Sequence, residues 1–161
     1  LAQGKNLALV SDAGTPGIND PGGKLIEEVV REFGDEVQII PIPGPNAAVA
    51  ALSISGFNVD QFLFLGYPPH KKGRRKFFKE VAEARHPVVF YESVHRIIRT
   101  LEELEKMFSS FAKASEDASE RKIVVARELT KKFETVYRGR IEEVIPQVEK
   151  QQLGEFVIVV S

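Results

Sequence analysis

A long loop rich in glycine and proline follows a short apolar run in the segment from Leu7 to Gly23, LALVSDAGTPGINDPGG. The apolar run is typical of a buried parallel strand, and the breakers after it exclude a regular element. Glycines allow the backbone to approach a ligand and leave their N–H groups accessible to it. Asp12 and Thr15 add an acceptor and a hydroxyl, which suit a ribose or an amino group. We interpret the segment as a ligand-binding loop, the alternative being an ordinary connection, and it matches neither a Walker loop nor GxGxxG.

The elements that position this loop alternate between strands and helices. Asp20 and Pro21 predict a helix start, with the carboxylate as N-cap, and Gly34 predicts the end of that helix. The next expected elements are a strand, a buried helix capped by Asn46 and a further strand, over 37–42, 47–54 and 61–65. Strand–loop–helix twice over, followed by a strand, is the signature of a parallel sheet. Ligands bind such sheets outside the carboxyl ends of the strands, where loops of this kind gather.

The segment from Gly66 to Pro69 has the composition of a domain boundary, because two prolines stiffen it and the chain changes character after it. We therefore expect the remainder of an N-terminal parallel α/β domain over 1–66 and a C-terminal α/β domain over 67–161. Closely spaced strands with few crossover helices predict a mixed sheet in the second domain. Residues 109–120, SSFAKASEDASE, lack periodicity, and we expect them to form a flexible surface insertion.

The composition restricts the class of protein. With 161 residues, of which 43% are hydrophobic, the chain is long enough to bury a sizeable core. A net charge of -1 gives no global nucleic-acid signature, so an RNA contact requires a local basic patch. The lack of cysteine excludes disulfides and suits a cytoplasmic location. No apolar run reaches the roughly 18 residues of a membrane span, and the three histidines lack the spacing of metal ligands, so we expect neither a membrane segment nor a metal site.

Five motifs occur in order along the chain: VSDAGTPGINDPG, PIPGPNA, FYESVHR, ARELTK and GEFVIVV. Together they strongly resemble the bacterial ribosomal RNA small subunit methyltransferase I family, within the tetrapyrrole methylase superfamily. The resemblance covers nearly the whole chain apart from 109–120. It implies a two-lobed fold of two α/β domains, with S-adenosylmethionine in the cleft between them, and a homodimer. It also implies methylation of the ribose 2′-hydroxyl of a cytidine in small-subunit (16S) rRNA, either free or in the assembled 30S particle.

The resemblance also assigns residues to the cofactor. The first cofactor loop of the family matches Ser11, Asp12, Ala13, Gly14, Thr15 and Ile18, and the second matches Gly44, Pro45, Asn46 and Ala47. The pattern of the superfamily implies that the adenosine is approached from the second domain by Tyr91, Ala126, Arg127, Leu129 and Glu155. Family members begin with a glycine-rich strand and loop. This sequence begins at Leu1 without them, so we expect it to be an N-terminally incomplete copy.

Methyl transfer to an alcohol requires an in-line approach and removal of the hydroxyl proton. Asp12 is a candidate base, although a structural or cofactor-orienting role suits its place in the loop better. Glu92 and Glu128 are alternatives, each at the end of an expected strand. The simpler interpretation of these two is that they form salt bridges with Arg96 or Arg127.

The run HKKGRRK after the expected domain boundary is strongly basic and contains Lys71, Lys72, Arg74, Arg75 and Lys76. Such a run is usually a solvated surface, but its position favours contact with the phosphates of rRNA. We predict that charge reversal at Arg74 and Arg75 weakens rRNA binding and spares the affinity for the cofactor. Two alternatives to an rRNA methyltransferase remain: a tetrapyrrole-type small-molecule methylase, which the basic run and FYESVHR disfavour, and a non-catalytic domain that binds cofactor or RNA.

Overall fold

The computed structural model describes residues 1–112 and 121–161, which form two compact units, Leu1–Asn46 (unit 1) and Ala47–Ser161 (unit 2). The boundary between these compact units lies after Asn46, because the first helix of unit 2, α2 (Ala47–Ser53), packs on the central strands of that unit. The domain boundary after Gly66 stays a prediction.

Unit 1 contains one α-helix, α1 (Gly23–Phe33), followed by a 3₁₀ helix, η1 (Gly34–Glu36). Gly34 ends α1 as predicted, with a φ of 49° and a backbone N–H that donates to the carbonyl of Val30. The predicted start is wrong, because the N-cap position is Gly22 and no side chain caps the helix there.

Neither of the strands predicted over 7–10 and 37–42 is formed, although every residue of unit 1 is described. Apolar side chains of both segments are exposed, among them Leu7, Val10 and Ile42. A parallel strand is stable only when neighbouring strands pair with it and both its faces are covered. Unit 1 offers neither segment such neighbours, so the parallel sheet expected for the first domain is not formed within it.

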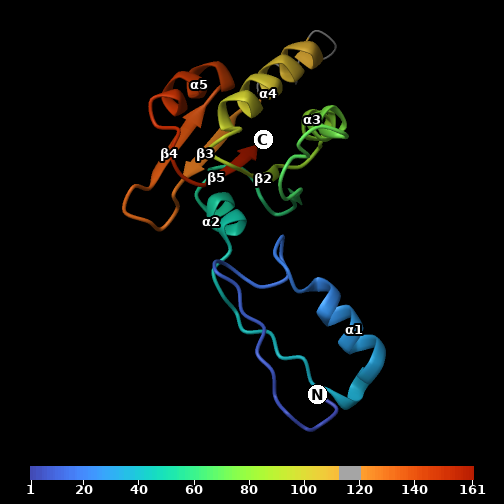
Figure 1. Cartoon of the computed structure of the whole chain (residues 1–161). Coiled ribbons are helices and arrows are strands. Elements are labelled where there is room, and N and C mark those ends of the chain that lie inside the picture. Colours follow the sequence, from blue (N-terminus) through green and yellow to red (C-terminus); the bar gives the residue numbers. More distant parts are fainter. Residues whose placement is uncertain (113–120) are drawn as a thin grey trace. The chain divides into compact units, whose positions relative to one another are not determined.

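Unit 2 contains a five-stranded mixed sheet in the order β1-β2-β5-β3-β4 (Figure 1). The strands are β1 (Leu63–Phe64), β2 (Val88–Glu92), β3 (Ile123–Arg127), β4 (Thr135–Gly139) and β5 (Phe156–Val160). β1 and β2 are parallel, and the other neighbouring pairs are antiparallel. The mixed sheet predicted for the second half of the chain is therefore confirmed, and β1 is shorter than the strand predicted over 61–65.

Helices cover both faces of this sheet (Figure 1). One face packs against α3 (Arg74–Glu83), α4 (Ile97–Ala112) and α5 (Ile141–Glu149), and the other packs against α2. Phe90 and Ile158 belong to the core on the three-helix side, whereas Val89 and Val157 belong to the core beneath α2. Because both faces are buried, the central strands are continuous apolar runs in the sequence. The α/β fold class predicted from the sequence is confirmed.

One local expectation changes. α4 extends to Ala112, so the first part of the predicted surface insertion is helical, and the remainder, 113–120, lies outside the described residues. Pro146 lies inside α5, which continues past it. Among the helices that the structure describes, none is long and apolar enough to cross a membrane.

The register of the sheet brings three strand ends together. Phe156, the first residue of β5, pairs with Glu92 at the end of β2 and with Arg127 at the end of β3. The chain leaving β1 joins them, because the Tyr91 N–H donates to the Gly66 carbonyl at 2.9 Å. We call this end of the sheet the Phe156 edge and define it as residues 66–69, 91–93, 127–134 and 150–156.

Candidate functional site

The loops around Gly14 and Gly44 lie against each other in unit 1. Thr15 Oγ1 donates a hydrogen bond to the Pro45 carbonyl at 3.4 Å. A Cβ added to Gly14 would lie 3.6 Å from the same carbonyl, and one added to Gly44 would lie 3.7 Å from Thr15 Oγ1. Gly14 also has a φ of +75°, which side chains disfavour. The structure therefore brings together the two loops that the resemblance assigns to the cofactor.

The first loop is braced by its own hydrogen bonds. Ser11 Oγ donates to the Ala13 carbonyl at 3.0 Å, and the Ile18 N–H donates to the Thr15 carbonyl at 3.3 Å. Asp12 is exposed. These short internal bonds hold the shape of the loop and leave the Asp12 carboxylate accessible.

Asp20 has an unusual carboxylate. Among the buried side-chain oxygens and nitrogens in the part of the chain that the structure describes, only Asp20 Oδ2 lacks a hydrogen-bond partner. The large majority of buried polar atoms are hydrogen-bonded. An unpaired carboxylate oxygen near the end of the glycine-rich loop is an acceptor for an N–H or O–H group of a ligand.

In unit 2, three aromatic rings gather at the Phe156 edge. The Tyr91 ring lies 5.2 Å from Phe64 and 5.5 Å from Tyr67, measured between centroids. Burial raises the pKa of Tyr91, against an opposing contact from the Ala48 N–H. Burial also raises the pKa of Tyr67, and the nearby Glu155 carboxylate raises it further. Both phenols are therefore protonated at neutral pH.

The other apolar residues assigned to this side of the site lie around Val157. Ala126 and Tyr91 pair with Val157 from the two neighbouring strands, so the three side chains point to the same face of the sheet. Ala126 is fully buried, and Leu129 packs against the same cluster. Ala47 is the first residue of α2, which covers this face.

Arg127 holds two loops of the Phe156 edge together. Its side chain is buried, with Nε donating to the Leu153 carbonyl and Nη1 donating to the Phe133 carbonyl at 2.8 Å. The loops joined in this way line a pocket of about 460 Å³. Arg127 therefore shapes the pocket by positioning its walls.

Glu128 forms a charged cluster with Lys131 and Glu155. Its Oε1 accepts hydrogen bonds from the Glu155 N–H at 2.8 Å and from Lys131 Nζ at 3.2 Å. The Glu155 N–H is the main cause that lowers the pKa of Glu128 below its ordinary 4.5. Lys131, rather than the expected Arg127, is the ion-pair partner. A Cβ at Gly154 would lie only 2.6 Å from Glu128 Cγ, so this arrangement requires glycine there.

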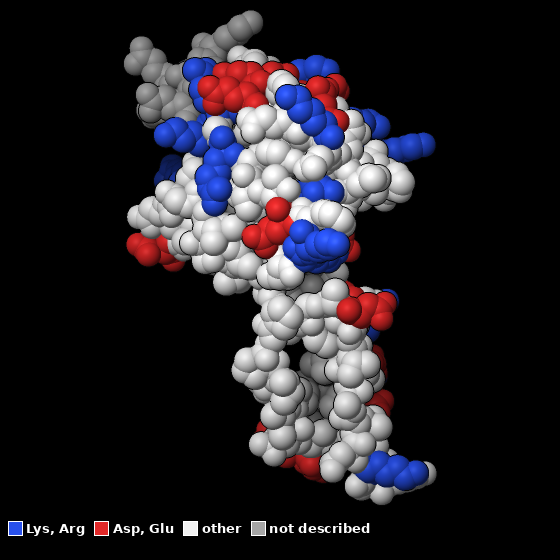
Figure 2. All heavy atoms as spheres, turned by 90° about the vertical axis from the view of Figure 1, so that its left-hand side faces the viewer, with Lys and Arg blue, Asp and Glu red and all other residues white. Residues whose placement is uncertain are grey.

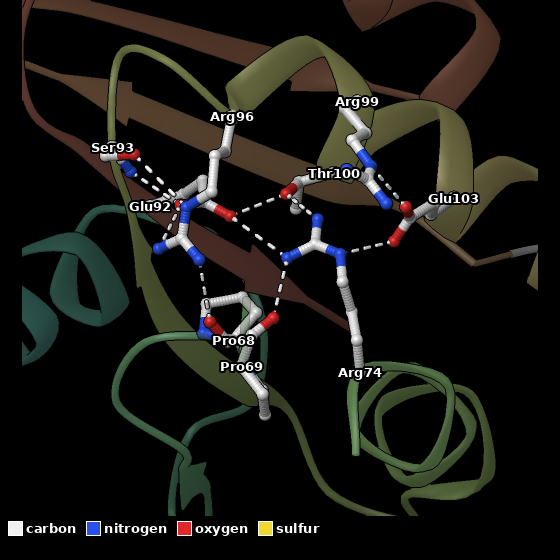
Figure 3. Close-up of polar contacts among 9 residues, drawn as sticks. All are labelled: Pro68, Pro69, Arg74, Glu92, Ser93, Arg96, Arg99, Thr100 and Glu103. Carbon is white, nitrogen blue, oxygen red and sulfur yellow. Dashed lines mark hydrogen bonds and ion pairs between the residues drawn. The ribbon is translucent and has the colours of Figure 1, made fainter. Parts of the chain in front are cut away.

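Glu92 is buried at the end of β2, with only 1% of its surface exposed, and both carboxylate oxygens have partners (Figure 3). Oε1 accepts from the Ser93 N–H at 2.7 Å and pairs with Arg96 at 2.9 Å. Oε2 accepts from the Thr100 hydroxyl at 2.5 Å and lies 3.9 Å from Arg74. The salt bridge between Glu92 and Arg96 was expected from the sequence. No sequence motif had pointed to Thr100 as a partner of Glu92.

The same two arginines hold the segment that follows β1 (Figure 3). Arg96 Nη1 donates to the Pro68 carbonyl at 2.9 Å, and Arg74 Nη1 donates to the Pro69 carbonyl at 3.2 Å. Arg74 Nε also donates to Glu103 at 2.7 Å. This buried network, formed by Arg74, Glu92, Arg96, Thr100 and Glu103, ties the end of β1 to α3, β2 and α4.

Arg74 is therefore not available for the RNA contact predicted from the sequence. Its residue surface is 5% exposed, and its guanidinium lies 4.8 Å from the centroid of the Phe78 ring. The rest of the basic run is exposed: Lys71, Lys72, Arg75 and Lys76. On the face that Figure 2 draws, basic and acidic side chains are interspersed over unit 2, so an RNA contact depends on local cations. Within 1–112 and 121–161, no group of three or more His, Cys, Asp or Glu side chains is arranged to hold a metal ion.

Comparison with known proteins gives the class. A family model described as Tetrapyrrole (Corrin/Porphyrin) Methylases matches residues 1–145. The crystal structure of the methyltransferase CobJ superposes with a TM-score of 0.61 at 21% identity, over 92% of this chain and 61% of that chain. Uroporphyrin-III C-methyltransferase from Thermus thermophilus, complexed with S-adenyl homocysteine, gives 0.54 at 16% identity, over 91% of this chain and 62% of that chain. The family model and these structures place the fold among the tetrapyrrole methylases.

Curated relatives define the family within that class. The ribosomal RNA small subunit methyltransferase I of Thermotoga maritima is 39% identical over 100% of this chain and 67% of its own length. Its namesakes from Escherichia coli O157:H7 and Xylella fastidiosa are 40% and 44% identical over 100% of this chain, and over 54% and 56% of their own lengths. The chain therefore belongs to the ribosomal RNA small subunit methyltransferase I family. It spans between about half and two thirds of the length of these relatives.

Proposed function

We propose that this chain is part of an S-adenosylmethionine-dependent methyltransferase that modifies the ribose 2′-hydroxyl of a cytidine in 16S rRNA. The observation that carries the proposal is the contact between the loops around Gly14 and Gly44. Relatives named ribosomal RNA small subunit methyltransferase I support rRNA as the substrate. The homodimer that the resemblance implies and the cytoplasmic location that the lack of cysteine suits are part of the same proposal.

The loops of unit 1 suit the chemistry of the cofactor. S-adenosylmethionine has N–H and O–H donors on its amino group, ribose and adenine, and Asp20 Oδ2 is a buried acceptor without a partner. Gly17 has a φ of +81°, and a Cβ added there would meet nothing within 4 Å, so the backbone is open to a ligand. We assign binding to Ser11, Asp12, Ala13, Gly14, Thr15, Ile18, Gly44, Pro45, Asn46 and Ala47. When bound, the cofactor supplies an electrophilic methyl group on a sulfonium.

The Phe156 edge offers a complementary surface in unit 2. We propose that the partly exposed Tyr91 and Leu129 provide its apolar contacts to the adenosine, and that the fully buried Ala126 supports them from within the same cluster. Arg127 contributes by positioning two loops, and Glu155 by its backbone hydrogen bond to Glu128.

The candidates for the proton acceptor differ in their surroundings. Glu92 is unsuited, because it is buried and already paired with two arginines. Glu128 has a lowered pKa and binds the Glu155 N–H and Lys131, so it is a weak base. Asp12 is exposed on the loop. We therefore propose Asp12 as the carboxylate that accepts the hydroxyl proton.

The exposed part of the basic run supports RNA binding. Lys71, Lys72, Arg75 and Lys76 follow the anchored prolines and are free of the buried network that occupies Arg74. Each phosphate that they neutralise releases counterions, so affinity falls steeply with salt.

A small tetrapyrrole is the second candidate substrate, because the matching solved structures include a cobalt precorrin-4 methyltransferase and a uroporphyrin-III C-methyltransferase. The test is transfer of labelled methyl groups from S-adenosylmethionine by the full chain to 30S particles, free 16S rRNA and uroporphyrinogen. Label at a cytidine 2′-hydroxyl of 16S rRNA supports the proposal. Label in uroporphyrinogen alone favours the second candidate, and calorimetric binding of the cofactor without any transfer indicates a non-catalytic domain.

A further inference from the structure

We propose that Tyr67 is a stacking platform for an unpaired base of single-stranded RNA, next to the cations of the exposed basic run. This inference rests on the proposed function, because it names the part of the RNA that unit 2 recognises. It assigns a binding role to a residue that the sequence motifs did not single out.

The Tyr67 ring is both accessible and supported. The residue is 48% exposed, and its ring rests at 5.5 Å from Tyr91, which in turn lies 5.2 Å from Phe64. The Tyr67 ring therefore contacts one aromatic neighbour at a tilt of 56°, and about half of the residue stays accessible to a planar ligand. Proteins that bind single strands combine such rings, which stack on bases, with cations that follow the phosphates.

The backbone on both sides of Tyr67 is fixed. Before it, the Gly66 carbonyl accepts the Tyr91 N–H at 2.9 Å. After it, the Pro68 and Pro69 carbonyls accept hydrogen bonds from Arg96 and Arg74, as Figure 3 shows. Glu92 in turn fixes both arginines. A platform ordered in advance loses little conformational entropy on binding, which gives the buried network a role in recognition.

The charges around Tyr67 favour a base there and phosphates further along. Glu155 and Glu92 lie close enough to raise the pKa of Tyr67, and Arg96 is the opposing cation. A neutral base is compatible with these carboxylates, whereas a phosphate is repelled by them. Lys71 is four residues along the chain, so its backbone lies within about 14 Å of Tyr67. The phosphates next to a stacked base therefore lie within reach of the exposed cations.

The test uses the full chain and a short single-stranded fragment of 16S rRNA carrying one 2-aminopurine, whose fluorescence is quenched on stacking. The label is moved through the fragment, and affinity is measured by anisotropy without S-adenosylmethionine. The variants are Tyr67→Leu, which removes the ring, and Tyr67→Phe, which keeps it. The matched control is Phe62→Leu, because Phe62 is 45% exposed but precedes β1, whereas Tyr67 follows it. Thermal melts confirm that each variant is folded.

We expect the wild-type chain and Tyr67→Phe to quench one label position and Tyr67→Leu to lose this quenching, with about 5- to 100-fold weaker binding. Phe62→Leu should match the wild type. The inference is overturned if Tyr67→Leu quenches and binds like the wild type, if Phe62→Leu loses as much, or if the wild-type chain binds no single-stranded RNA. Because methyl transfer is measured separately, Tyr67-dependent quenching without transfer would reject the proposed function and leave the stacking platform standing.

Discussion

Replacing Glu92 by glutamine should destabilise unit 2 strongly, because the carboxylate faces hydrogen-bond donors on both sides. Ser93 N–H and Arg96 point to Oε1, and the Thr100 hydroxyl and Arg74 point to Oε2. A glutamine has the same size but only one acceptor oxygen. In either orientation its NH₂ group therefore faces donors. Arg96 loses its counter-charge, whereas Arg74 keeps its ion pair with Glu103 at 2.7 Å.

The magnitude follows from burial. Removing one partner of a buried ion pair costs about 3–5 kcal/mol, because the remaining charge stays buried and uncompensated. For a chain of this size, this corresponds to a decrease in Tm of roughly 6–20 °C. The assay is urea unfolding followed by far-ultraviolet circular dichroism, with the free energy of unfolding extrapolated to water.

Arg99→Gln is the matched control for Glu92→Gln. Arg99 pairs with Glu103 at 2.8 Å at the outer end of the same network, but its side chain is 67% exposed. An exposed pair of this kind contributes at most about 1 kcal/mol. A Glu92→Gln variant as stable as Arg99→Gln, or within about 1 kcal/mol of the wild type, would refute the importance assigned to the buried carboxylate.

Three further changes follow from the site. Gly154→Ala should destabilise the chain by about 1–3 kcal/mol in the same assay, and by more than the control Gly56→Ala. Both glycines have a positive φ, but only a Cβ at Gly154 would meet other atoms within 4 Å, among them Glu128 Cγ. Equal effects of the two substitutions would count against this contact. Glu128→Gln should lower the free energy of unfolding at neutral pH. Because the pKa of Glu128 is lowered in the folded state, its stabilisation is present above pH 4.5 and is lost as the pH falls through the folded pKa. If the difference in urea midpoint between variant and wild type stays constant below pH 4.5, this prediction is contradicted. Charge reversal at Arg75 and Lys76 should weaken binding of 16S rRNA and flatten its salt dependence without changing calorimetric affinity for S-adenosylmethionine, and an equal loss of both affinities would reject the RNA contact.

The fold of unit 2 was largely predictable because its signals are local. The apolar runs that became β2, β3 and β5 are buried on both faces, and such runs predict a strand correctly where neighbouring strands and helices cover them. In unit 1 the same kind of run failed as a predictor. Residues 7–10 are as apolar as a buried strand, but strand formation also requires neighbours, which sequence periodicity does not reveal.

The site shows the same limit. Motifs identified the two loops that meet at Thr15 and Pro45, because glycine and proline mark such loops directly. The buried position of Arg74 was not predictable, since a charge run gives no sign that one member is turned inward onto Glu92 and Glu103. The sequence did not point to Tyr67 as a binding residue, because a single exposed aromatic residue indicates no function until its neighbours in space are known.

The most direct test of the cofactor site is isothermal titration of the full chain and two glycine variants with S-adenosylmethionine. Gly14→Val places a side chain beside the Pro45 carbonyl, whereas Gly34→Val introduces a similar positive-φ strain at the end of α1, where a Cβ meets nothing within 4 Å. Both variants carry the same new side chain in unit 1, so they separate loss of the site from loss of stability. We predict that the wild type and Gly34→Val bind and that Gly14→Val loses at least about tenfold in affinity, equivalent to about 1.4 kcal/mol. Absence of binding by the wild type, or equal binding by Gly14→Val, would contradict the assignment of these loops to the cofactor.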